Sequence, residues 1–260
     1  MDVTVKPVLR GCFVTGTDTE VGKTRITAGL LRWLARQGVR SAGYKPVAAG
    51  MEQDADGRWS NEDVRELQAA ASVALEADQI CGAQFRLACA PHIAAEREGR
   101  QIDRTALHAG THALAPLADR VVVEGAGGLC VPLGDDWDSA DLMTDLGLPV
   151  VLVVGMRLGC INHALLTAEA VCARGLTLAG WVANSVQPSM PFFEENLQTL
   201  TQQMERRFDA PCVGVVPYLT PLTADAVADN LDTRQLCRVF ALDQEPQVSP
   251  EANSVKTLNR

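Results

Sequence analysis

The sequence predicts an α/β fold in which a mostly parallel sheet carries helices on both faces of a single domain. Short apolar runs alternate with segments of helical periodicity along the chain, which is the pattern of βα units. Several runs, including VVLVV at residues 150–154, are apolar at every position, as strands covered on both faces are. A chain of 260 residues that is 47% apolar and 21% charged can bury such a core without structural metals.

The alternation places six strands and six helices along the chain. The apolar runs predict strands at residues 11–15, 39–44, 120–123, 150–154, 178–183 and 212–216. The helical patterns predict helices at residues 22–37, 61–74, 103–118, 162–173, 192–208 and 224–239. The polar stretch MEQDADGRWS at residues 51–60 is expected to be a loop. Residues 1–242 are therefore predicted to form one domain, followed by a polar, mobile tail at 243–260.

Charge and cysteine usage exclude several classes of protein. The formal net charge of −9 argues against binding to duplex nucleic acid, although a local cationic site can still take a nucleotide. The eight cysteines form no C-x-x-C pair and no zinc-ligand spacing, which indicates small buried side chains in a reducing compartment. The start MDVTVKPVLR lacks the apolar run of a signal peptide, and the longest apolar stretch, 149–156, is too short to span a bilayer. We therefore expect a cytoplasmic protein with neither nucleic acid nor membrane as a partner.

Five polar segments begin where predicted strands end. They are GTDTEVGKT at 16–24, KPVAAG at 45–50, EGAGG at 124–128, NS at 184–185 and PYL at 217–219. Ligands of open α/β sheets bind at the carboxyl ends of the strands. The five segments are therefore predicted to build one site.

The first of these segments has the features of a P-loop. Its glycines let successive N–H groups face one anion, and the helix that follows adds the positive end of its dipole. Lys23 can reach the β- and γ-phosphates, and the Thr24 hydroxyl can hold Mg²⁺. Five residues, rather than the usual four, separate Gly16 from Gly22, so a chance glycine turn before a helix is the alternative. The strand–loop–helix context favours the P-loop NTPase fold.

Two carboxylates and a second lysine are expected beside this loop. Glu124 ends an apolar strand, where burial of a carboxylate is costly unless a cation meets it, and its alternative role is the cap of a following turn. Asp63 opens a predicted helix, where an acidic residue also favours the dipole without any metal. Lys45 is predicted at the carboxyl end of the second strand, where it can clamp an anion or lie in solvent.

In combination and order, seven segments resemble the dethiobiotin synthetase family, over about residues 11 to 220. They are GTDTEVGKT (16–24), GYKPVAAG (43–50), NEDV (61–64), APHIAA (90–95), VVVEGAGG (121–128), VVGMRLGCINHALLTA (153–168) and LAGWVANSV (178–186). The extra residue in the phosphate loop is itself typical of that family. The resemblance implies a P-loop fold and an enzyme that uses ATP and Mg²⁺ to close the ureido ring of dethiobiotin from 7,8-diaminononanoate and CO₂ or bicarbonate.

The resemblance also implies roles for individual residues. Lys45 and Lys23 are the catalytic candidates, with Lys45 contacting the carbamate, and Thr24, Asp63 and Glu124 bind Mg²⁺. The nucleotide-binding set comprises Thr19, Glu20, Val21, Gly22, Lys23, Thr24, Arg25, Asp63, Glu124, Gly125, Ala126, Gly127, Asn184, Ser185, Pro217, Tyr218 and Leu219. Within it, Asn184 reads the adenine edge, although one amide leaves the preference for ATP over CTP or GTP open.

The substrate side is implied to involve a second copy of the chain. The family is a homodimer with active sites at the subunit interface, where a helix opened by Gly159, Cys160 and Asn162 receives the substrate carboxylate. The implied substrate contacts are Lys45, Ala49, Pro91, Gly127, Gly159, Cys160 and Asn162. Two residues depart from the family pattern, because Ala49 and Ala90 stand where serines are usual. An acidic residue near the adenine is not fixed by the motifs, and Asp225 is one candidate.

Two other functions fit parts of the pattern. An amide-forming ligase of the cobyrinate or CTP synthase type also uses a P-loop but usually carries a glutaminase domain, for which 260 residues leave no room. A switch ATPase of the partitioning or septum-positioning type carries an extra lysine early in the loop, where this chain has Asp18, and often a membrane or DNA tether. Phosphate release that requires both diamine and bicarbonate distinguishes the dethiobiotin ligase from such a switch.

Overall fold

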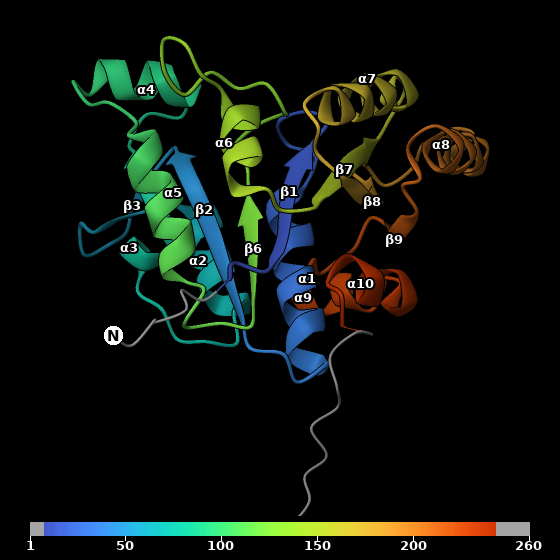
Figure 1. Ribbon diagram of the computed structural model, residues 1–260, viewed down its shortest axis with the longest axis horizontal. Coiled ribbons are helices and arrows are strands. Elements are labelled where there is room, and N and C mark those ends of the chain that lie inside the picture. Colours follow the sequence, from blue (N-terminus) through green and yellow to red (C-terminus); the bar gives the residue numbers. More distant parts are fainter. Residues whose placement is uncertain (1–7, 243–260) are drawn as a thin grey trace, which may run out of the picture.

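The computed structural model describes residues 8–242 and confirms the predicted α/β fold (Figure 1). Seven parallel strands form one sheet in the order β5-β2-β6-β1-β7-β8-β9. These strands are β1 (Gly11–Gly16), β2 (Ser41–Ala49), β5 (Cys81–Phe85), β6 (Arg120–Glu124), β7 (Val150–Met156), β8 (Leu178–Ser185) and β9 (Cys212–Val216). A separate two-stranded hairpin consists of β3 (Glu52–Gln53) and β4 (Trp59–Ser60).

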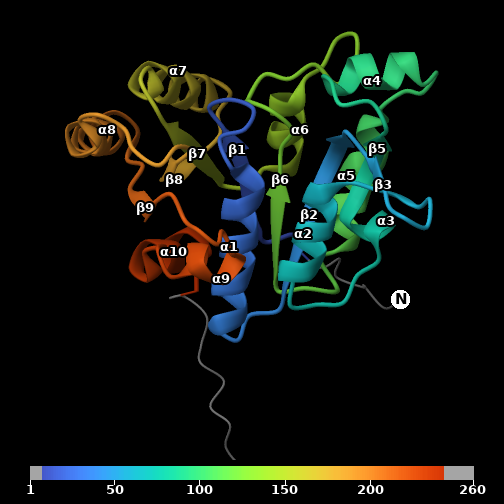
Figure 2. The same cartoon turned by 180° about the vertical axis from the view of Figure 1, so that it is seen from behind.

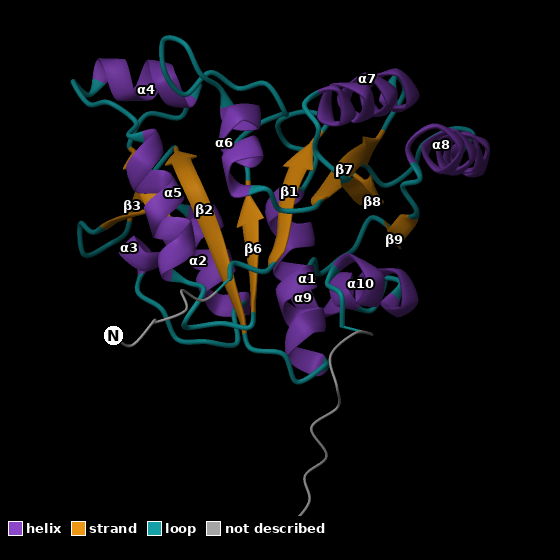
Figure 3. Cartoon of the chain, viewed as in Figure 1, coloured by secondary structure: helices purple, strands orange, loops and turns teal. Residues whose placement is uncertain are grey.

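Helices cover both faces of the sheet, as the two opposite views show (Figures 1 and 2). The face seen in front in Figure 2 carries α1 (Lys23–Arg36), α2 (Glu62–Ala70), α9 (Ala224–Ala228) and α10 (Thr233–Val239). The opposite face carries α5 (Arg104–Ala113), α6 (Ser139–Leu146), α7 (Cys160–Ala173) and α8 (Phe193–Phe208). Two short helices, α3 (Ala77–Ile80) and α4 (Pro91–Arg97), precede and follow β5 along the chain, and both lie on the β2 side of the sheet (Figure 3).

The core lies along the central strands. Every residue of β1, β6 and β7 is buried, which is the burial expected for strands with helices on both sides. Trp33 and Trp181, expected in the core, are 3% and 0% exposed. Because β1 lies between β6 and β7, its carboxyl end opens at the middle of the sheet edge.

The second strand is longer than the sequence predicts. The prediction ended it at residue 44, but β2 continues to Ala49, so Lys45 lies inside the strand and not at its carboxyl end. Pairing with β5 carries β2 onward, and CGAQF at 81–85 was not predicted because its apolar run is too short. Pro46 is tolerated there because the pairing of β2 with β6 ends at Tyr44.

Other elements were also missed or differ in length. The helix predicted at 224–239 is two helices, because Leu231 forms a bridge with Gly214 and Asp232 caps α10. The short helices α3, α4 and α6 were not predicted, and the loop at 51–60 contains the β3–β4 hairpin. The helix expected at 61–74 ends at Ala70, and that expected at 103–118 ends at Ala113.

The cysteine prediction is half right. All eight thiols are free, but only Cys12, Cys81 and Cys160 are buried, whereas Cys89, Cys130 and Cys172 are exposed. Between residues 8 and 242, no helix is both long and apolar enough to cross a membrane. The predicted tail at 243–260 lies outside the described residues.

Candidate functional site

The phosphate loop connects β1 to α1 at the centre of the sheet edge. Gly22 takes a left-handed conformation, with φ of 86°, and no side chain caps the helix that begins at Lys23. The first N–H groups of α1 are therefore not used by a side-chain cap, as an anion site requires. Upstream, the Thr19 N–H donates to Asp18 Oδ1 at 2.8 Å, and Glu20 has a φ of 58°. The loop thus curls as the sequence predicts, with one more residue than the usual pattern.

Lys23 lies over this loop. Its ammonium donates to the Asp18 carbonyl at 3.0 Å, and the residue is 7% exposed. Burial, aided by the positive charge of Lys45, lowers the pKa of Lys23 to about 8. The two ammonium groups therefore lie close enough for the charge of one to affect the pKa of the other.

Thr24, Lys45, Asp63 and Glu124 form a compact cluster next to the loop. The Thr24 hydroxyl lies 2.7 Å from Asp63 Oδ1 and 2.8 Å from Glu124 Oε1. The Lys45 ammonium lies 2.5 Å from Glu124 Oε1 and 2.8 Å from Asp63 Oδ2. Four elements, α1, β2, α2 and β6, thus bring together residues that are up to 100 positions apart.

The electrostatics of this cluster follow from its burial. Burial alone lowers the pKa of Lys45, but the charges of Glu124 and Asp63 outweigh it and hold that pKa above its usual value. Burial raises the pKa of Asp63, but Lys45 and Thr24 together hold it below its usual value. Lys45 is therefore charged and Asp63 ionised at neutral pH.

The oxygen ligands of the cluster fit Mg²⁺. Glu124 is 0% exposed, and its Oε2 is buried without a hydrogen-bond partner. One ammonium between two carboxylates also leaves the cluster with net negative charge. Two carboxylates and a hydroxyl beside a phosphate site form the donor set that Mg²⁺ uses with a nucleotide. Within residues 8–242, no group of three or more His, Cys, Asp or Glu side chains forms a larger metal site.

Asn61 is a positioning residue that the sequence analysis did not single out. It caps α2 by accepting from the Val64 N–H, and its amide donates to the Gly50 carbonyl at 3.0 Å. This contact fixes the start of α2, which carries Asp63, against the end of β2, which carries Lys45. The sequence could have indicated this role, because Asn61 is a favourable N-cap residue that stands two positions before Asp63.

The EGAGG segment packs against the phosphate loop. A Cβ on Gly127 would lie 3.5 Å from Thr19 Oγ1, and a Cβ on Gly128 would lie 3.7 Å from the Gly16 carbonyl. The Gly125 carbonyl faces Lys45 at 3.5 Å. Ala126 is half-buried between these glycines. The structure thus places Gly125 next to Lys45, and Gly127 and Gly128 next to the phosphate loop.

A pocket lies beyond the ends of β8 and β9. Its lining includes Ser185, Pro217 and Tyr218, which the resemblance assigns to the side of the base, and its volume is about 510 Å³. Leu219 instead packs on the hydrophobic core. Further lining residues that the sequence analysis missed are Met156, Gln187, Pro188, Ser189, Met190, Phe193, Glu194, Val215 and Asn230. Only the segment from Gln187 to Met190 carried a signal in the sequence, because it closely follows β8 at this edge of the sheet.

Asn184 lies between this pocket and the phosphate loop. Its residue is 8% exposed, and its Nδ2 donates to the Val21 carbonyl at 2.9 Å. A Cβ on Gly22 would lie 2.3 Å from that nitrogen. The amide nitrogen of Asn184 is therefore used within the protein.

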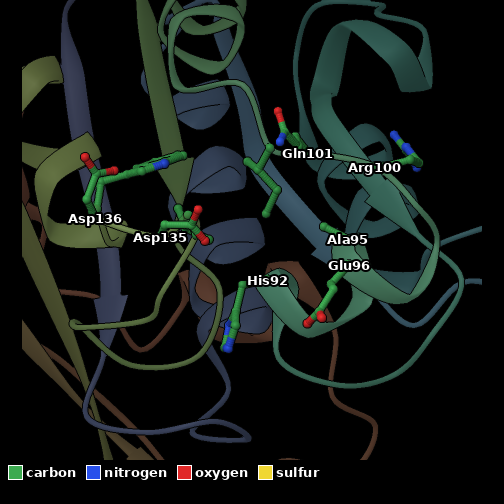
Figure 4. A pocket seen from close by; sticks show the side chains of 11 residues that line it. His92, Ala95, Glu96, Arg100, Gln101, Asp135 and Asp136 are labelled. Carbon is green, nitrogen blue, oxygen red and sulfur yellow. The ribbon is translucent and has the colours of Figure 1, made fainter.

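A second pocket, of about 400 Å³, is lined by His92 and by other residues of α4 and the segment after it. Figure 4 shows His92 and Glu96 of α4 on one side of it, and Asp135 and Asp136 from the loop between β6 and α6 on the other. His92 Nδ1 is buried without a hydrogen-bond partner. Ala49 ends β2, and Pro91 is the first residue of α4.

Some predicted residues make contacts elsewhere. Arg25 forms ion pairs with Glu62 and Glu66 of α2, at 3.0 and 2.8 Å. Asp225, one candidate for the adenine side, forms ion pairs with Arg32 and Arg36 on α1.

The helix predicted to receive a substrate carboxylate is α7. It begins after Gly159, with φ of 96°, without a side-chain cap, and Asn162 is exposed in its first turn while Cys160 is buried. Arg157, just before it, forms an ion pair with Asp18 of the phosphate loop at 2.6 Å. The segment leading into α7 is thus joined to the loop, a contact that the sequence analysis missed.

Comparison with known proteins agrees with this fold. A family model described as an AAA domain matches residues 10–226. Among solved structures, a chain of the MinC:MinD cell division protein complex of Aquifex aeolicus is similar, with a TM-score of 0.51 and 12% identity over 91% of this chain and 97% of that one. A ParA family ATPase from Chlorobium tepidum TLS is also similar, with a TM-score of 0.46 and 12% identity over 92% of this chain and 95% of that one. At such identity the first likeness shows the fold alone.

Proposed function

The chain belongs to the AAA-domain family, and from that premise we propose that it is an ATP- and Mg²⁺-dependent cyclo-ligase of the dethiobiotin synthetase type. That family contains dethiobiotin synthetase, and its P-loop fold supports nucleotide binding and hydrolysis. The proposed reaction converts 7,8-diaminononanoate, CO₂ and ATP into dethiobiotin, ADP and phosphate.

One observation carries the proposal, namely the second buried lysine at the phosphate loop. Lys45 is 4% exposed and contacts both carboxylates that face Thr24. In a P-loop hydrolase the loop lysine, the threonine and a carboxylate suffice for the phosphates and the metal. A further buried ammonium beside them favours a second anion, and a carbamate formed on the substrate is such an anion.

When Mg²⁺ is bound, Thr24, Asp63 and Glu124 would hold it, and it would neutralise charge on the nucleotide phosphates. Lys23 would bind the terminal phosphates from the loop side. The pocket lined by Ser185, Pro217 and Tyr218 would take the base. These roles distribute the nucleotide along the sheet edge from β9 to β1.

The proposed chemistry needs no nucleophile from the protein. One amine of the diamine adds to CO₂ and loses a proton, which gives a carbamate. A carbamate oxygen attacks the γ-phosphorus of ATP and releases ADP, and the second amine then attacks the carbamate carbon and expels phosphate, closing a five-membered urea. The task of the chain is to hold these groups together and neutralise their charge, with Lys45 on the carbamate.

We also propose a homodimer that completes the substrate site. Gly159, Cys160 and Asn162 of one subunit would meet Ala49, Pro91 and Gly127 of the other. Support comes from two exposed apolar side chains, Leu158 just before α7 at 94% exposure and Leu166 in the middle of that helix at 57%. The uncapped N–H groups of α7 suit a substrate carboxylate.

Phosphate release tests the proposed function. Purified protein with Mg-ATP should release phosphate only when both 7,8-diaminononanoate and bicarbonate are present, and mass spectrometry should find dethiobiotin in equal amount. Release without diamine would instead support a switch ATPase. An analogue of 7,8-diaminononanoate with only one amine is the matched control, because it can form a carbamate but cannot close the ring and so cannot give a cyclic urea.

A further inference from the structure

The contact between Asn184 and the phosphate loop extends the proposed nucleotide site. The side-chain amide of Asn184 is directed to the phosphate loop, where its Nδ2 donates a hydrogen bond to the Val21 carbonyl at a distance of 2.9 Å. Val21 is 1% exposed and directly precedes the glycine at the start of α1. Because the Val21 carbonyl is buried, water cannot replace the Asn184 amide as its donor, and loss of this hydrogen bond would leave the carbonyl without a partner.

The space around this contact is closed by the backbone itself. A Cβ on Gly22 would lie 2.3 Å from Asn184 Nδ2 and 3.4 Å from its Cγ. Gly22 also has a φ of 86°, so the side chain of Asn184 packs directly on the bare backbone of the loop. The amide therefore fixes both the direction of the Val21 carbonyl and the entry of the chain into α1.

We infer that Asn184 is a positioning residue for the triphosphate, and that it holds the phosphate loop in its anion-binding shape whether or not a base is bound. Because Asn184 belongs to β8, at the end nearest the base pocket, its contact joins the base side of the site to the phosphate side. This inference rests on the proposed nucleotide site, and it differs from a role in reading the base alone. A base-reading residue would matter only for ligands that carry a base.

Tripolyphosphate, which has the phosphates of ATP without the nucleoside, separates the two roles. We expect Asn184→Asp and Asn184→Ala to weaken the binding of Mg-tripolyphosphate and of Mg-ATP by at least about tenfold each in calorimetry. Asn184→Asp is nearly isosteric and keeps an acceptor for a base while losing the donor to Val21. Tyr218→Ala, in the base pocket, should weaken Mg-ATP but leave Mg-tripolyphosphate within about twofold.

Hydrogen exchange provides a second readout that needs no ligand. Amides in peptides spanning residues 16–24 should exchange at least about tenfold faster in free Asn184→Asp than in the unchanged protein. Gln53→Ala is the matched control, since Gln53 also donates a side-chain amide to a main-chain carbonyl, at 2.8 Å from Gly57, but in the remote hairpin. In the Gln53→Ala variant, the amides of the phosphate loop at residues 16–24 should exchange at the same rate as in the unchanged protein.

The outcomes separate the two proposals. If the Asn184 variants lose only Mg-ATP binding and their loop amides exchange as before, the residue reads the base and the inference is wrong. If the unchanged protein binds neither Mg-ATP nor Mg-tripolyphosphate, the proposed nucleotide site fails, whereas faster loop exchange in Asn184→Asp would still support the positioning contact.

Discussion

At the scale of single residues, the cluster around Lys45 contains a buried carboxylate, which is costly for stability, among the groups proposed to bind the ligands. Glu124 is fully buried, and its charge is met by the Lys45 ammonium and the Thr24 hydroxyl. A buried carboxylate without such partners would destabilise the fold. The same groups that would hold the metal and the carbamate therefore also hold one another in the free protein.

Replacing Lys45 should separate catalysis from nucleotide binding. We expect Lys45→Ala to lower turnover at least about 100-fold, because the carbamate and the transferred phosphoryl group lose a cation, while ATP still binds. Steady-state phosphate release and calorimetry measure the two quantities. Turnover close to that of the unchanged enzyme would rule out the role of Lys45.

The same substitution should lower the stability of the metal-free protein. It leaves the fully buried Glu124 without its cation, which costs about 3–5 kcal/mol of unfolding free energy for a buried pair. Urea denaturation measures the change. The double variant Lys45→Ala, Glu124→Gln is the control, since it removes both charges and should recover much of the loss without recovering turnover.

The lowered pKa of Lys23 predicts a pH dependence of nucleotide binding. With a pKa of about 8 in the free protein, the ammonium is mostly charged at pH 6.5 and mostly neutral at pH 8.5. A bound triphosphate favours the charged form, so binding should take up a proton at pH 8.5 and almost none at pH 6.5, and affinity should fall above pH 8. Calorimetry in two buffers of different ionisation enthalpy measures the uptake, and equal uptake at both pH values would contradict this prediction.

At the scale of elements, α1 is held by an unusually close contact with α9. A Cβ on Gly29 would lie 2.3 Å from Val227 Cγ1 and 2.9 Å from Val227 Cβ, so the two helices meet at a residue without a side chain. Ion pairs from Arg32 and Arg36 to Asp225, at 3.2 and 2.9 Å, join the same helices at the surface. Since α1 begins with Lys23 and Thr24, this packing also orients the phosphate loop.

Gly29→Ala should therefore destabilise the protein although alanine favours helices. The overlap with Val227 Cβ cannot be removed by rotating a side chain, so we expect a net loss of about 1–2 kcal/mol in urea denaturation. In a Val227→Ala background, which removes Cγ1 and with it the closest overlap but keeps Cβ, the same substitution should cost clearly less. An equal loss in both backgrounds would show that the helix contact is not the cause.

How far the sequence predicts the elements depends on their apolar content. The runs at 11–15, 120–123 and 212–216 correspond to β1, β6 and β9 within a residue at each end. By contrast β5, with glycine and glutamine in five residues, exists because β2 offers it an edge, which is a tertiary effect. The break between α9 and α10 likewise depends on the bridge from Leu231 to Gly214 in β9.

The site shows the same division. The sequence predicts that Lys23, Thr24, Glu124 and Asn184 lie at one edge of the sheet, because they are at or just after the carboxyl ends of parallel strands. It does not reveal that the Asn184 amide faces Val21 or that Arg157 meets Asp18, since each contact depends on side-chain directions between distant elements. It also put Lys45 at a strand end, whereas the β2–β5 pairing extends the strand past it.

At the scale of the whole molecule, the proposed homodimer predicts a measurable mass. Leu166→Lys places a charge on the exposed apolar part of α7, which should convert a dimer to a monomer in sedimentation velocity experiments. Turnover with the diamine should fall with it, while Mg-ATP binding persists. Thr105→Lys, at an exposed position of α5, is the control and should remain dimeric. An unchanged protein that sediments as a monomer would contradict the dimer.

The central place of β1 in the sheet affects how the chain can fold while it is being synthesised. One edge of β1 is paired with β6, which ends at residue 124, but the other pairs with β7, which ends at residue 156. During synthesis of the intervening stretch, a strand destined for complete burial has one open side, the kind of edge that captures other nascent chains. Chaperones that shield growing polypeptides are most useful in that interval, before Asn184 exists to complete the ligand site.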